Sequence, residues 1–190
     1  MNKLHTISGL IQLERYSKVV EYIEGISHQN QEIIEVLNKS IKNSHVAGIL
    51  LAKYYKAEEA KISLEIDSSS YLDKSSKNIT DGELCSIIGN LIENAIDELV
   101  KKGNGKIVVK INCDAENLKI LIRDNGMGMD ENIRQRIFER GVTTKEGKRG
   151  FGLYIIKQII DRAEGQIKFH EDNGVTWDIC IPLEGGSRCD

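Results

Sequence analysis

The hydrophobic pattern of this chain changes its period near residue 58, and that change constrains the fold more than any other feature. Before it, apolar residues recur at the three- and four-residue spacing of amphipathic helices. After it, residues 61–66 alternate between apolar and polar side chains, which is typical of a half-buried strand. We therefore expect an α+β protein with two domains, 1–58 and 59–190.

The first domain is predicted to be a helical hairpin. Its two helices would be separated by a break over residues 25–30, where glycine, serine, histidine and asparagine interrupt the apolar pattern. Such a hairpin cannot bury its apolar stripes alone, whereas two copies bury them in a four-helix bundle. We therefore expect a homodimer formed through these helices.

The second domain is predicted to place helices on one face of a mixed sheet. The helices are expected over residues 80–102, 131–138 and 152–163. The strands are expected over residues 61–66, 106–113, 118–123, 166–170 and 175–181.

Charge and hydropathy exclude two classes of partner. The chain has 26 Lys and Arg against 29 Asp and Glu, a formal net charge of −3, and no long basic run, so nothing indicates nucleic-acid binding. Apolar runs are only a few residues long, and the first residues lack the core of a signal peptide. We expect a cytoplasmic segment without membrane contact of its own.

Asn90 and Asn94 form the first motif, inside the predicted helix over residues 80–102. Residues four apart share a helix face, and amides are costly to bury without partners. An amide oxygen suits Mg²⁺, which also keeps waters and nucleotide phosphates as ligands. Capping or solvated asparagines have the same spacing, so the motif alone leaves both interpretations open.

Asp124, Gly126 and Gly128 form the second motif, directly after a predicted strand. The glycines allow close backbone approach, and the carboxylate can accept a hydrogen bond from an amino group such as adenine N6. A glycine turn with a surface aspartate is the alternative.

Glycines and cations that lead into the predicted helix over residues 152–163 form the third motif. Free N–H groups and the dipole at a helix start attract phosphate, and Lys145, Lys148 and Arg149 add positive charge. The spacing of a Walker A loop is absent. A flexible surface loop is the alternative.

In this order, the motifs resemble the ATP-binding domain of sensor histidine kinases, which gyrase, MutL and a large heat-shock chaperone share. The segments NLIENA, DNGMGM, IFERGVTTK and RGFGLYIIK stand where that family has its asparagine, first glycine, phenylalanine and second glycine boxes. The opening MNKLHTISGL is similar to the dimerisation helix of citrate and C4-dicarboxylate sensor kinases. The resemblance implies an α/β sandwich that binds ATP between sheet, helices and a mobile lid.

The resemblance also implies roles for individual residues. Asn94 is similar to the Mg²⁺ ligand, and Asn90 to the neighbour that orients the phosphates. Asp124 is similar to the adenine-reading carboxylate, with Gly126 and Gly128 beside the base.

Further roles concern the lid and its surroundings. Phe138 is similar to the residue that packs the lid on the core, and Thr176 to a threonine near the adenine. Lys148 stands where many relatives have a glycine. The residues that match the phosphate-gripping lid are Thr143, Lys145, Arg149, Gly150 and Gly152.

The function implied by the resemblance is that of a protein-histidine kinase. It would use Mg-ATP to phosphorylate a histidine, from which the phosphoryl group passes to a response regulator. The acceptor histidine of that subfamily precedes the stretch matching MNKLH by about two helical turns, so we expect it to lie before Met1, and we expect the whole kinase to be membrane-anchored. A gyrase- or MutL-type ATP hydrolase and a non-catalytic ATP-binding dimer are the alternatives.

Overall fold

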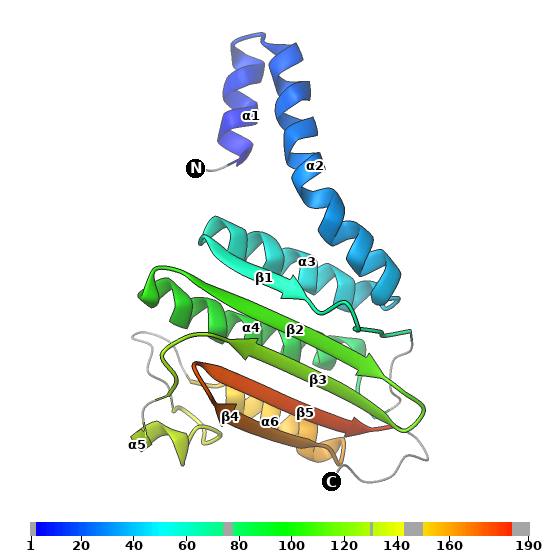
Figure 1. The fold of residues 1–190 in the computed structure, drawn as a ribbon, viewed down its shortest axis with the longest axis vertical. Helices are drawn as coiled ribbons and strands as arrows, with labels where there is room; N and C mark the ends of the chain where they lie inside the picture. The colour runs from blue at the N-terminus through cyan, green and yellow to red at the C-terminus, as the bar shows by residue number, and fades with distance from the viewer. Residues whose placement is uncertain (1–2, 74–77, 130, 143–149, 184–190) are drawn as a thin grey trace. The chain divides into compact units, whose positions relative to one another are not determined.

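A computed structural model describes residues 3–73, 78–129, 131–142 and 150–183 of the chain (Figure 1). The chain divides into two compact units, Met1–Val36 and Leu37–Asp190, which are taken separately below. No helix in the described ranges is both long and apolar enough to cross a membrane.

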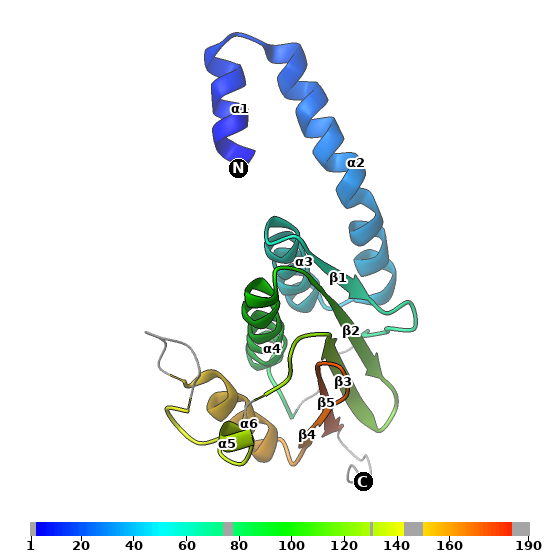
Figure 2. The ribbon, with the colours of Figure 1, turned by 60° about the vertical axis from the view of Figure 1, so that its left-hand side comes forward.

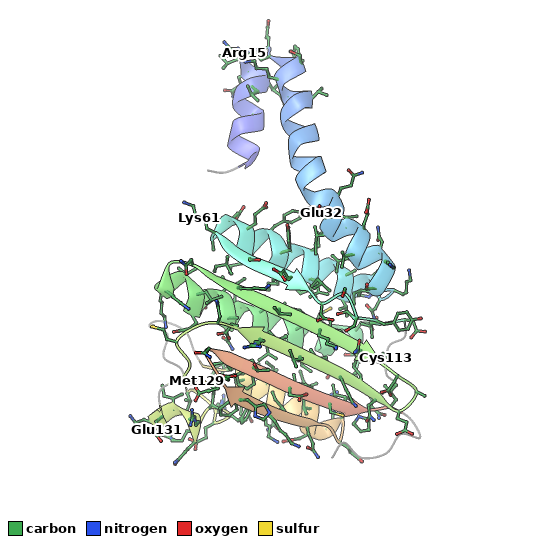
Figure 3. The ribbon with its side chains drawn as sticks, in the orientation of Figure 1. Arg15, Glu32, Lys61, Cys113, Met129 and Glu131 are labelled. Carbon is green, nitrogen blue, oxygen red and sulfur yellow. The ribbon has the colours of Figure 1, made fainter. Side chains whose placement is uncertain are left out.

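The N-terminal unit contains α1 (Lys3–Gln12) and most of α2 (Tyr16–Ser40). The helices meet at a turn in which Arg15 N–H donates to Leu10 O at 3.0 Å and Glu14 has a φ of 54° (Figure 3). The break expected over residues 25–30 is therefore wrong, because those residues lie inside α2. Glycine and polar residues weaken a helix by only about 1 kcal/mol or less each, which a long helix tolerates.

The second unit begins before the domain boundary that was expected near residue 58. Helix α2 ends at Ser40, and α3 (Ser44–Glu59) starts after Asn43, whose Oδ1 accepts from the N–H groups of His45 and Val46, both at 3.1 Å. Helix α3 packs on α4 and β1. It therefore belongs to the unit that holds the sheet rather than to the hairpin.

The sheet is mixed, as predicted, with the strand order β1-β2-β3-β5-β4. Strand β1 is parallel to β2, and every other neighbouring pair is antiparallel. The strands are β1 (Ile62–Ile66), β2 (Gly105–Cys113), β3 (Asn117–Asp124), β4 (Gln166–Glu171) and β5 (Val175–Pro182).

Helices α4 (Asp81–Lys102) and α6 (Gly152–Arg162) pack together beside one face of this sheet (Figure 2). Apolar side chains at alternate positions of the strands point to that face and are buried, as in Ile120 and Ile122 of β3. The short α5 (Glu131–Arg134) stops before Phe138, where the sequence predicted its end. The expected α+β architecture is confirmed.

Helix α4 is held at both ends by local interactions. Thr80 and Glu83 form a reciprocal capping box, and Gly103 ends the helix in a left-handed conformation with a φ of 89°. Glu83 also accepts two hydrogen bonds from Arg162, at 2.6 and 2.7 Å, which lower the pKa of Glu83 to about 2. This contact joins the end of α6 to the beginning of α4.

The turn between β4 and β5 lies directly on the end of β3. Gly174 has a φ of 130°, and a Cβ added there would lie 2.0 Å from the carbonyl oxygen of Asp124. Only glycine combines that backbone angle with so close an approach. The predicted hairpin turn at residues 172–174 is thus confirmed, and it packs against Asp124.

We expect Gly174→Ala to lower the free energy of unfolding by on the order of 3 kcal/mol, because it adds backbone strain and a clash with Asp124. Gly82→Ala in α4 is the matched control, since a Cβ there has no heavy atom within 4 Å. It should leave stability unchanged or raise it by up to about 1 kcal/mol. Urea unfolding of both variants tests the packing of this turn, and equal stabilities would contradict it.

Candidate functional site

Asn90 and Asn94 lie half-buried on α4, well inside the helix, so they do not cap it. The Asn90 Nδ2 donates to Ser86 O at 2.7 Å and to Ser86 Oγ at 3.3 Å. A Cβ added at Gly152 would lie 3.1 Å from Asn90 Oδ1. The amide oxygen of Asn90 therefore faces the first residue of α6.

Asp124 ends β3 and is only 5% exposed. Its Oδ1 accepts from Gly126 N–H at 2.8 Å and from Val175 N–H at 3.3 Å. Burial raises the pKa of Asp124, these two hydrogen bonds oppose the shift, and the charge of Glu98 adds to it. The site thus holds a buried carboxyl group, and the alternative of a surface aspartate is wrong.

The glycine loop after β3 is held against both α4 and β4. A Cβ at Gly126 would lie 3.1 Å from Glu98 Cγ, and one at Gly128 would lie 3.3 Å from Glu171 Oε1. Met129, which is labelled in Figure 3, donates its N–H to the same Glu171 oxygen at 2.6 Å. Arg134 forms an ion pair with Glu171. The loop is therefore anchored on either side of Met127, which is 72% exposed.

The motifs converge along α4. Gly152 lies against Asn90, whereas Gly126 and Asp124 lie at Glu98, two helical turns further on. Asn94 lies between Asn90 and Glu98, four residues and about one helical turn from each, so the three residues share a helix face. The structure thus brings together residues that are far apart in sequence, on the side of α4 that the asparagine motif predicted.

The start of α6 places the backbone N–H groups of a helix N-terminus next to Asn90. Its N-cap residue, Phe151, makes no side-chain capping hydrogen bond. Gly141 N–H donates to Gly150 O at 3.2 Å, so these two glycines lie together before the start of α6. The predicted lid residues Thr143, Lys145 and Arg149 lie outside the described residues.

An aromatic cluster connects the phenylalanine motif to the sheet. The Phe138 ring lies edge-on to Trp177 of β5, with centroids 6.1 Å apart, and Phe169 contacts the same indole at 5.4 Å. Arg140 lies over the Phe151 ring at 5.3 Å. The segment before the third motif thus rests on β5 and on the start of α6.

Thr176 does not lie with the site residues around Asp124 and α4. It lies between the buried Val175 and Trp177 on β5, and it pairs across the sheet with the exposed Arg123. Side chains alternate along a strand, so Thr176 points to the face opposite Asp124. The resemblance placed a threonine near the adenine at residue 176, whereas the buried residue that contacts Asp124 on β5 is Val175.

Two residues at the site were missed from the sequence. Glu98 contacts the glycine loop, and its position four residues after Asn94 is the signal that could have identified it. Glu171, at the end of β4, accepts from the N–H of Met129, which is 42 residues away in sequence, and no local pattern indicates that contact.

Comparison with known proteins agrees with this geometry. Residues 80–185 match the family of histidine kinase-, DNA gyrase B- and HSP90-like ATPases. A probable C4-dicarboxylate sensor kinase of Bacillus subtilis (strain 168) is 37% identical over 190 residues, which are 97% of this chain and 36% of that protein. Sensor histidine kinase CitA of Klebsiella pneumoniae is 36% identical over 96% of this chain and 34% of its own length. The chain therefore spans about a third of these relatives.

Solved structures give the same result. The nucleotide-free catalytic domain of histidine kinase ThkA has a TM-score of 0.62 and 25% identity, covering 74% of this chain and 91% of that domain. Histidine kinase AdeS of Acinetobacter baumannii shares the fold with a TM-score of 0.58 and 18% identity, over 96% of both chains. This chain therefore belongs to the histidine kinase-, DNA gyrase B- and HSP90-like ATPase family, and its ATPase domain is of the histidine kinase type.

Proposed function

We propose that this chain is the kinase core of a two-component sensor histidine kinase. It binds Mg-ATP and transfers the γ-phosphoryl group to a histidine, from which it passes to a response regulator. The observation that carries this proposal is the convergence on α4 of Asn90, Asp124 and the start of α6. These groups supply an amide oxygen, a purine-reading carboxyl and phosphate-binding N–H groups.

Asp124 is suited to read the adenine of the nucleotide. Two backbone N–H groups hold its Oδ1, so its orientation is set before any ligand arrives. The second carboxyl oxygen can then accept a hydrogen bond from an exocyclic amino group. Adenine carries such a group and guanine presents a carbonyl oxygen at the same ring position, so this contact favours ATP over GTP.

Asn94 is suited to hold Mg²⁺ together with the nucleotide phosphates. In the described part of the chain, no three His, Cys, Asp or Glu side chains gather as metal ligands. A single amide oxygen fits Mg²⁺, which takes most of its ligands from water and phosphate. Bound there, the cation would neutralise charge on the phosphates.

The remaining contribution of the protein is positioning, which dominates phosphoryl transfer. The amide of Asn90 and the N–H groups at the start of α6 lie together and would orient the phosphates. Thr143, Lys145 and Arg149, which match the family's phosphate-gripping lid, would add further contacts to the phosphates. A neutral imidazole is nucleophilic near neutral pH and would attack the oriented γ-phosphoryl group.

The hydrolase alternative is disfavoured because position 90 carries an amide, Asn90, and not a carboxylate. Related hydrolases carry a glutamate where Asn90 stands, and an amide cannot accept that proton. Glu93 does not replace it, because it binds Lys53 at 2.6 Å and also Lys56, both on α3. Burial alone would raise the pKa of Glu93, but these two lysines outweigh it and hold the pKa below its ordinary value.

The partners follow from the same proposal. The kinase would act as a homodimer through α1 and α2, where Ile11, Leu13, Tyr16 and Val20 are 47–65% exposed in the single chain. A second copy would cover these side chains. The protein would act in the cytoplasm on a response regulator, and the complete kinase would be membrane-anchored.

We expect Asp124→Asn to weaken ATP binding roughly tenfold or more while the protein stays folded. The amide oxygen would take the two backbone N–H groups, so the amide nitrogen would face the adenine amino group and set donor against donor. Asp178→Asn makes the same change on the exposed face of β5 and is the control. Calorimetry that shows equal ATP affinity for both variants would contradict the adenine contact.

We expect Asn94→Ala to remove the magnesium-dependent part of ATP affinity, a loss of about tenfold or more. Titrations of ATP with Mg²⁺ and with a chelator measure that part directly. Asn104→Ala, at an exposed position just after α4, is the control and should keep the full response. A magnesium response that survives in Asn94→Ala would exclude the residue as the metal ligand.

The kinase activity is tested with radiolabelled ATP and a separate helical domain of a relative that carries the acceptor histidine. We expect label on histidine, which acid removes and base does not. Free phosphate as the sole product would favour the hydrolase. Bound ATP without turnover would favour the non-catalytic dimer, and either result would overturn the proposal.

A further inference from the structure

Glu98 lies on the same side of α4 as the asparagine motif but has no part in the proposed phosphate or adenine contacts. Asn90, Asn94 and Glu98 follow one another at intervals of four residues. The Glu98 side chain is 25% exposed, and its Cγ lies 3.1 Å from where a Cβ of Gly126 would be. A Cβ at the same Gly126 would lie 2.8 Å from Asp124 Oδ1, so the Glu98 side chain lies against the glycine loop and near Asp124.

Two charges define the surroundings of this carboxylate. Lys101 donates to Glu98 Oε2 at 3.0 Å, which holds the side chain along the helix. Toward the loop, Glu98 Cγ and Asp124 Oδ1 face the same point beside Gly126, and the negative charge of Glu98 adds to the raised pKa of Asp124. Glu98 is thus a charged acceptor held between Asn94 and the buried Asp124.

The covalent order of an adenine nucleotide determines what this position faces. Asn94 would meet the metal and phosphates, and Asp124 would meet the base. The sugar must bridge these two ends. Glu98 is one helical turn, about 6 Å, beyond Asn94 and touches the loop that carries Gly126, so it is placed at the bridge.

The chemistry of a carboxylate also favours the sugar. It accepts hydrogen bonds and donates none, and the ribose hydroxyls are the donors between base and phosphates. Phosphates, in contrast, would be repelled by it. We propose that Glu98 binds the ribose 2′- and 3′-hydroxyls and makes the site selective for ribonucleotides, an inference that rests on the proposed ATP binding.

The test compares Mg-ATP, Mg-2′-deoxyATP and Mg-3′-deoxyATP by calorimetry on the unmodified chain, Glu98→Ala and Glu98→Gln. We expect the unmodified chain to bind ATP about tenfold more tightly than at least one deoxy analogue, in line with the loss of a hydrogen bond to a charged group. Glu98→Ala should bind ATP only as tightly as the unmodified chain binds that analogue. Its affinity for the analogue itself should be unchanged or higher. Glu98→Gln keeps an acceptor and should retain part of the preference.

The control is Glu65→Ala, because Glu65 also pairs with a lysine, Lys106 at 2.7 Å, but stands on the edge strand β1. It should bind all three nucleotides as the unmodified chain does. Tight ATP binding without preference for the hydroxyls, or an equal loss of all three nucleotides in Glu98→Ala, would overturn the ribose contact alone. Failure of the unmodified chain to bind any of the three would instead overturn the proposed ATP binding.

Discussion

The burial of α4 between the sheet and its neighbouring helices is the interaction on which the whole site depends. Ile87, Ile88, Leu91, Ile92 and Leu99 are completely buried, which fixes the rotation of the helix about its axis. Because the apolar side of α4 is held in this way, Asn90, Asn94 and Glu98 must lie together on another side. Interiors are close-packed, so this rotation leaves little freedom.

The other site elements are each fixed to α4 or to one another by a few polar contacts. Helix α6 packs along α4, with Arg162 bound to Glu83 at one end and Gly152 against Asn90 at the other. Asp124 is held by backbone N–H groups from its own loop and from β5. A buried acceptor satisfied by backbone donors is preorganised, so little ordering remains to be done when a ligand binds.

The absence of a glutamate at position 90 distinguishes the two enzymatic interpretations within this family. A hydrolase must remove a proton from water, whereas a kinase of this type uses an imidazole nucleophile and needs oriented phosphates. Asn90 donates to Ser86 and turns its oxygen toward α6, and in the proposed mechanism it would orient the phosphates and transfer no proton. Glu93, the nearest carboxylate in sequence, serves the packing of α3 on α4.

The sequence by itself determined the mixed sheet, the limits of α4 and α6 to within a residue or two, and the identity of the asparagine and glycine motifs. Those features depend on local signals such as strand alternation, the Thr80 capping box and Gly103. Only the tertiary structure decided that residues 25–30 continue α2, that α3 joins the unit that holds the sheet and that Thr176 faces away from Asp124. It also decided the contacts of Glu98 and Glu171 with the glycine loop. These outcomes depend on packing between residues distant in sequence and on strand register, in which a shift of one residue turns a side chain to the opposite face of the sheet.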